Sequence, residues 1–163
     1  MFKKKFVNPA LLSALFFSLG CKSLPPLPAV NLSEPGWKIQ HGQAVWKPKK
    51  DAPEIAGELL VATNSDGRAF VQFTKTPFPF VIAQASSGGW QIEFAAANKK
   101  FSGRGNPPQR IIWLQLPHFT EKLESPHVVS FKTRQWARQT FEGNRWLLRN
   151  RITGESLEGF LAP

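Results

Sequence analysis

Short apolar segments separated by turn residues follow one another from Trp37 onward, and this pattern constrains the fold more than any other feature of the chain. The segments are rich in Val, Ile, Phe, Trp and Thr, which favour β-strands. The clusters between them, such as Asn-Ser-Asp-Gly at 64–67 and Ser-Gly-Gly at 87–89, favour tight turns. The sequence therefore predicts successive antiparallel strands. They are expected at 37–46, 54–63, 68–74, 78–86, 89–97, 128–133, 134–141, 145–150 and 155–161, with a turn at 142–144.

Several of these segments carry apolar residues on both faces. In 54–63, Leu59 and Val61 lie on one face while Leu60 and Ala62 lie on the other. A sheet with one face in water would alternate more cleanly, so either both faces are covered or the sheet curls around an apolar interior. We expect a mostly β fold, with a curved antiparallel sheet or unclosed β-barrel and one or two short covering helices. A core completely filled by side chains, without a cavity, remains open.

One segment favours a helix. Pro107 and Pro108 precede 109–116, and Pro117 follows it. Proline suits the first turn of a helix and the position just after its end, and a helix here has Ile112 and Leu116 on one face. A strand remains open, because the segment contains Ile-Ile-Trp at 111–113.

The first 36 residues have a different character. A basic start is followed by an apolar stretch at 6–19, which is too short to span a bilayer, so residues 1–20 are predicted to be a secretory signal. Residues 18–21, Ser-Leu-Gly-Cys, resemble the lipobox of bacterial lipoproteins, which implies that Cys21 carries a diacylglycerol. Residues 21–36 include four prolines and are expected to form a semi-extended lipidated tether. Residues 37–163 are expected to form a single domain. The alternative to a lipidated Cys21 is a free cysteine near an ordinary cleavage site, or an uncleaved anchor.

Charge and cysteine content exclude several functions. The single cysteine rules out an intramolecular disulfide and a Cys-rich zinc site. The formal net charge is +10, and loss of the three lysines within residues 1–20 lowers it to +7. A basic protein anchored to a membrane favours anionic headgroups, although scattered charges also serve solubility alone. An exported protein without a nucleic-acid-binding pattern is not expected to bind nucleic acid.

Residues suited to catalysis are scattered along the chain. His41, His118 and His127 are far apart in the sequence, and we find no phosphate-binding loop or nucleophile elbow. We therefore expect no enzyme, no cofactor and no metal. Folding that brings Glu58 or Glu93 beside a histidine would leave catalysis open.

A large aromatic residue lies between two prolines at a predicted hairpin tip, in Pro77-Phe78-Pro79. The prolines stiffen the tip and remove backbone donors that would have to be desolvated in lipid. An exposed Phe78 would suit insertion into a membrane interface. Folding of Phe78 back onto the core is the alternative.

The order of these features resembles the LolA/LolB lipoprotein-carrier family. The matching features are the lipidated Cys21 and its Pro-rich tether, a first strand with Gly-Gln-Ala at 42–44, and the hairpin at Pro77-Phe78-Pro79. Further matches are Pro107-Pro108 before Trp-Leu-Gln-Leu-Pro at 113–117, and Gly-Asn-Arg-Trp at 143–146. The family's Pro-Leu-Gly hairpin carries a protruding Leu that promotes insertion of cargo into the membrane. Phe78 falls on that Leu, and Pro79 replaces the Gly.

The resemblance implies a non-enzymatic protein, monomeric and anchored in the outer membrane facing the periplasm. Its partners would be acylated lipoprotein cargo, a periplasmic LolA-like carrier and outer-membrane lipid. Cargo acyl chains would lie against the concave apolar face. An envelope structural or interaction lipoprotein with a packed β domain is the alternative. The residues expected to line an acyl cavity are Leu59, Val61, Val71, Phe73, Ile82, Phe94, Trp113 and Leu116.

Overall fold

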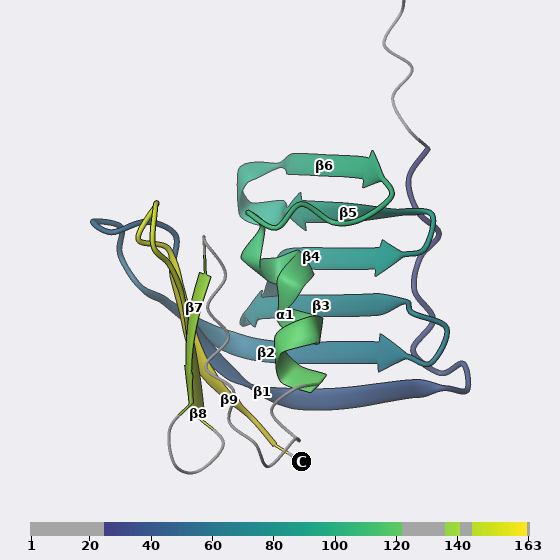
Figure 1. Ribbon diagram of the computed structural model, residues 1–163, viewed down its shortest axis with the longest axis horizontal. Coiled ribbons are helices and arrows are strands. Elements are labelled where there is room, and N and C mark those ends of the chain that lie inside the picture. The colour runs from purple at the N-terminus through teal and green to yellow at the C-terminus, as the bar shows by residue number, and fades with distance from the viewer. Residues whose placement is uncertain (1–24, 122–135, 141–144, 163) are drawn as a thin grey trace, which may run out of the picture.

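A computed structural model describes residues 25–121, 136–140 and 145–162. The described strands form one antiparallel sheet in the order β6-β5-β4-β3-β2-β1-β9-β8-β7 (Figure 1). The sheet is not closed, because β6 and β7 remain at its two edges. The predicted mostly β, open antiparallel fold is confirmed. The strands are β1 (Trp37–Lys47), β2 (Ile55–Asn64), β3 (Ala69–Lys75), β4 (Phe78–Ser86), β5 (Gly89–Phe94), β6 (Lys99–Arg104), β7 (Trp136–Thr140), β8 (Arg145–Asn150) and β9 (Ser156–Leu161).

The sheet curls strongly at β1. In Figure 1, β2 to β6 lie side by side, whereas β7, β8 and β9 run steeply across their direction. The joint is made by β1, which pairs with β2 on one side and with β9 on the other. The last strands along the chain thereby extend the sheet from its first strand, and the inner face becomes concave.

Helix α1 (Ile112–Glu121) packs on the concave face, where it contacts β2, β3, β4 and β5. The segment 109–116, which left helix and strand open, is helical from Ile112 onward, so the helix begins three residues later than predicted. Ile112 and Leu116 are both completely buried, as expected for one apolar face turned toward the sheet. The helix and the strands enclose one hydrophobic core.

The helix is longer than predicted. Pro117 was expected just past its end, but α1 continues through it to Glu121. A proline inside a helix removes one backbone hydrogen bond. Pro117 is buried and lines a small hollow together with Ala69, Ala83 and Ala85 of the sheet.

The fifth strand and its surroundings also differ from the prediction. Residues 95–97 form a short 3-10 helix, η3 (Ala95–Ala97), instead of continuing β5. Strand β6 was not predicted, because this edge strand is mostly polar and exposed and so lacks an apolar pattern. The predicted strand at 128–133 and the turn at 142–144 lie outside the described residues.

Residues 25–36, part of the predicted tether, lie on the domain. The Leu27 N–H donates to Gln91 Oε1 at 3.2 Å, and Arg68 Nη1 lies 3.0 Å from Glu34 Oε2. These partners come from the side of the sheet opposite α1 and from the β2–β3 turn. This part of the chain is free of helix and strand, as a Pro-rich segment should be, but it follows the sheet instead of standing away from it.

Candidate functional site

Four connections meet at one end of the sheet. They are the β1–β2 loop (48–54), the β3–β4 turn (76–77), the β5–β6 turn (95–98) and the β8–β9 turn (151–155). Antiparallel pairing places them together, since Trp46 pairs with Ile55 and Lys75 with Phe78, while Lys47 pairs with Ser156. We call this the hairpin end.

Phe78 is exposed at the hairpin end. It is the first residue of β4, directly after Pro77, and its side chain is 74% exposed. The register between β3 and β4 shifts near Thr74, and this irregularity accompanies an inward-facing Phe80 beside the exposed Phe78. Phe78 therefore does not fold back onto the core. The sequence placed the residue at a tip, and the structure places it at the start of the strand.

An aromatic cluster fills the interior behind Phe78. The ring centroid of Trp46 lies 6.1 Å from that of Phe80, 6.1 Å from that of Phe94 and 5.3 Å from that of Trp113. Phe73 lies 5.2 Å from Trp113. These contacts join β1, β3, β4, β5 and α1. The curl of the sheet is thus held at this end by Trp46, which reaches across the interior.

Trp46 is also tied to the β8–β9 turn. Its indole Nε1 donates to Glu155 Oε1 at 3.0 Å. Burial of the carboxyl group disfavours its charged form and raises the pKa of Glu155 to about 7, while the hydrogen bond from Trp46 opposes that rise. The raised pKa results from structural burial, and the described contacts give this carboxyl no catalytic partner.

Of the predicted acyl-cavity residues, seven face the concave side of the sheet and one, Ile82, faces the opposite side. Six of them are at most 1% exposed and belong to the packed core: Leu59, Val61, Val71, Phe73, Trp113 and Leu116. Phe94 is partly buried against that core. Ile82 faces the other side of the sheet, because it alternates with the inward-facing Val81 and Ala83. A hollow between α1 and β3–β4 has no room for a water molecule, so side chains fill this part of the concave face.

Two tryptophans bring unpartnered donors into this core. Trp113 and Trp146 are 1% and 2% exposed, and within the described part of the chain neither indole Nε1 has a hydrogen-bond acceptor. A buried donor without an acceptor costs about 1–3 kcal/mol. A ligand that brings a carbonyl oxygen into this interior would recover part of that cost.

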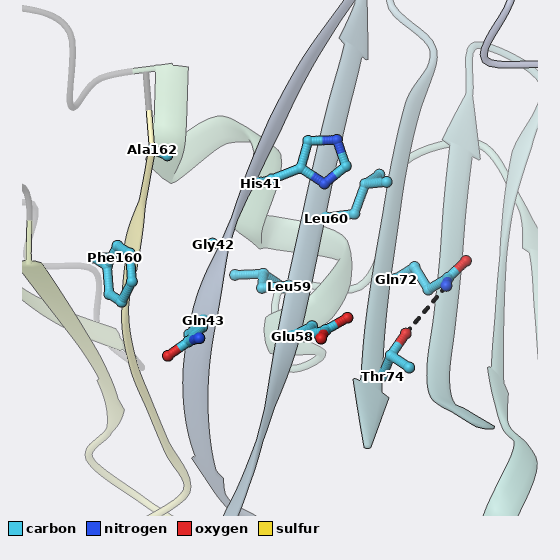
Figure 2. A pocket seen from close by; sticks show the side chains of 10 residues that line it. All are labelled: His41, Gly42, Gln43, Glu58, Leu59, Leu60, Gln72, Thr74, Phe160 and Ala162. Atoms are coloured by element: carbon cyan, nitrogen blue, oxygen red, sulfur yellow. Dashed lines mark hydrogen bonds between the residues drawn. The ribbon is translucent and has the colours of Figure 1, made fainter. Parts of the chain in front are cut away.

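A groove of about 450 Å³ lies on the opposite face of the sheet, across β1, β2, β3 and β9 (Figure 2). His41 and Glu58 both line it, so folding does bring these two residues to one place. Both side chains are exposed, and among the described residues no hydrogen bond joins them. The hydroxyl group of Thr74 accepts a hydrogen bond from Gln72 Nε2 at 3.1 Å. These contacts do not assemble an activated nucleophile.

Other predicted site residues lie apart or outside the described residues. His118 is exposed on α1, far along the chain from His41, and Glu93 pairs with Lys100 at 3.1 Å. Cys21 and His127 are outside the described ranges. Within those ranges, no three side chains of the metal-binding types gather. The helices described in this structure are too short or too polar to cross a bilayer.

Comparison with known proteins adds no relative to these observations. No protein-family model matches the chain, and no curated protein matches it.

Proposed function

We propose that this chain is a lipid-anchored envelope protein that binds the acyl chains of lipoproteins and helps to insert them into the outer membrane. The observation that carries the proposal is Phe78, 74% exposed on a proline-flanked hairpin. Moving an exposed Phe side chain from water into an apolar phase is worth about 1.5–3 kcal/mol. That energy is enough to hold the hairpin at a lipid surface transiently and too small to fix it there.

The concave face is the proposed acyl site. Its apolar residues come from eight strands of the sheet, β1 to β5 and β7 to β9, and from α1, but they pack against one another in the described structure. An acyl chain must therefore displace α1 or part of the aromatic cluster. Burial of acyl carbons at about 0.8 kcal/mol per methylene offsets the cost of this displacement, and the unpartnered indoles of Trp113 and Trp146 offer donors to an ester carbonyl.

In this proposal Cys21 carries the lipid that anchors the chain, and a periplasmic LolA-like carrier supplies the acylated cargo. The chain performs no covalent chemistry on the cargo. The proposed steps are exchange of acyl chains between two apolar sites, followed by entry of Phe78 into the lipid interface.

A second candidate is an envelope interaction protein that docks a partner without carrying lipid. The filled hollow between α1 and the sheet favours it, because a packed interior needs no ligand. The groove on the opposite face would then be the docking surface.

Replacement of Phe78 separates the two candidates. Phe78→Glu should leave folding intact, because the side chain is exposed, but should slow insertion of acylated cargo into outer-membrane vesicles at least about tenfold, since a charged tip enters lipid poorly. Phe160→Glu is the matched control, because Phe160 is 41% exposed and lies on the groove face. The Phe160→Glu protein should insert cargo at the normal rate.

The possible outcomes point in different directions. Normal insertion by the Phe78→Glu protein would refute the role of the hairpin. Loss of function in Phe160→Glu alone would favour docking through the groove.

A further inference from the structure

A second apolar tip lies at the hairpin end, in the β8–β9 turn. Ile152 is 76% exposed there, slightly more than Phe78. The turn is well ordered by its own hydrogen bonds. Asn150, 1% exposed, accepts at Oδ1 from the N–H of Ile152 at 2.9 Å and from that of Thr153 at 3.2 Å. The exposed Ile152 therefore belongs to a defined turn.

The two apolar tips belong to one continuous piece of structure. Glu155, in the same turn as Ile152, accepts from Trp46, and Trp46 contacts Phe80, two residues after Phe78. The β1–β2 loop joins the group, because the N–H of Lys50 donates to the carbonyl oxygen of Thr153 at 3.4 Å. Figure 1 shows the β1–β2 loop and the β8–β9 turn side by side at the left.

Exposed cations surround these tips. They lie in two of the connections or at the strand ends beside them, and no ion pair joins them to an acidic residue within the described residues. Acidic residues are fewer here: Asp51 is exposed, Glu54 lies 3.9 Å from Lys47, and Glu155 is turned inward to Trp46. The exposed cations are Lys49, Lys50, Lys75, Lys99, Arg149 and Arg151.

The opposite end of the sheet differs in charge pairing. There Arg68 forms two ion pairs, with its Nε 2.7 Å from Asp66 Oδ2 and its Nη1 3.0 Å from Glu34 Oε2. Arg104 and Arg110 are exposed away from the hairpin end, but most of the exposed cations without an ion pair among the described residues lie where the apolar tips are.

We infer that the hairpin end is a two-point membrane-docking surface, in which Phe78 and Ile152 enter the lipid while the surrounding lysines and arginines bind anionic phospholipid headgroups. This rests on the proposed function and extends it, because two separated contacts fix how the domain sits on the bilayer. Exposed apolar side chains supply the depth of binding, and basic side chains supply attraction to anionic lipid. With this end on the bilayer, the aromatic cluster around Trp46 faces the membrane.

The single natural cysteine makes a site-resolved test possible. In the full-length chain with Cys21→Ser, a cysteine is introduced by Phe78→Cys, Ile152→Cys or Phe160→Cys and is labelled with a polarity-sensitive dye. Vesicles of equimolar phosphatidylethanolamine and phosphatidylglycerol should shift the emission to the blue at positions 78 and 152. The dye at position 160, on the groove face, should report water.

Charge is tested separately. With the dye at position 78, the pair Arg149→Gln and Arg151→Gln should weaken vesicle binding about fivefold for each arginine removed. The matched pair Arg104→Gln and Arg110→Gln, both exposed and away from the hairpin end, should leave it unchanged.

The results distinguish this inference from the proposed function. A shift at 78 with no shift at 152 would overturn the two-point surface and leave the role of Phe78 standing. No shift at either position would overturn both. Equal binding to pure phosphatidylcholine vesicles, or no effect of the arginine changes at 149 and 151, would overturn the binding of anionic headgroups.

Discussion

Glu155 holds a carboxyl group largely out of water, where Trp46 donates a hydrogen bond to it. Its pKa of about 7 lies above the ordinary 4.5, so between these pH values the folded chain binds a proton that the unfolded chain does not. The stability that neutral Glu155 contributes is therefore present at low pH and lost as the pH rises through about 7.

We predict that the free energy of unfolding falls between pH 5 and pH 8, with Glu155 contributing up to about 3 kcal/mol of the fall. Glu155→Gln removes the ionisation and keeps an acceptor for Trp46, so its stability should vary less over this range. Urea unfolding at both pH values measures the difference. An equal fall in the two proteins would show that Glu155 is not responsible.

Phe78, the Trp46–Glu155 contact and Ile152 differ in how far the sequence predicts them. The flanking prolines predict that Phe78 lies at a tight hairpin, but the sequence left open whether its side chain is exposed or folds back onto the core. The contact between Trp46 and Glu155 spans 109 positions in sequence, so no local pattern reports it. The exposure of Ile152 was not predicted, although Asn150, whose buried side chain accepts the N–H of Ile152, is only two positions away in the sequence.

Among the elements, β1 determines the curl of the sheet, because it pairs with β2 on one side and with β9 on the other. It pairs with β9 through Gly42, where an added Cβ would lie 1.9 Å from the carbonyl oxygen of Phe160. Because the obstacle is backbone, a side chain cannot turn away to make room. The close approach of β1 and β9 therefore requires glycine at this position.

Gly42→Ala should destabilise the domain by about 1–3 kcal/mol, since relieving the clash means moving the two strands apart. Gly88→Ala is the matched control, because its Cβ would meet nothing closer than Ser86 Oγ at 3.9 Å. Thermal unfolding followed by circular dichroism measures both. Equal midpoints for the two variants would contradict the close approach at Gly42.

Helix α1 covers the proposed acyl site, so a change in it can test the proposal. Leu116 is completely buried between α1 and the sheet, so Leu116→Ala should cost about 2–5 kcal/mol. If α1 must move to admit an acyl chain, the same change should also increase uptake of a fluorescent fatty acid. Leu148→Ala on β8, where the leucine is 1% exposed, should lower stability without that increase. Equal uptake by both variants would argue against movement of α1.

The elements themselves were largely predictable because most of them rely on local patterns. Apolar strands bounded by turn residues were found close to their observed positions, whereas β6 escaped because its residues are polar and exposed. The extension of α1 through Pro117 was not predicted, because the local preference of proline favours the end of a helix and the buried position of Pro117 against the sheet is a tertiary feature.

At the scale of the whole molecule, the arrangement of these elements follows from long-range pairing. Apolar residues on both faces of several strands predicted a curled or covered sheet. The structure shows the curl, with α1 on the concave face, while on the other face Leu27 bonds to Gln91 of β5 and a groove lies across β1, β2, β3 and β9. The sequence left open whether the interior is filled. It could not be settled from patterns, because the packing of Trp46 against Phe80, Phe94 and Trp113 joins parts of the chain that are distant in sequence.

The proposed function requires the domain to take up acylated cargo at its concave face and to meet the membrane at its hairpin end. Native mass spectrometry of the full-length protein, purified gently from envelopes, tests it most directly. We predict a population carrying one acylated polypeptide per chain, lost on addition of excess fatty acid. A protein that is bare under these conditions, and remains bare when mixed with purified acylated lipoprotein, would contradict the account.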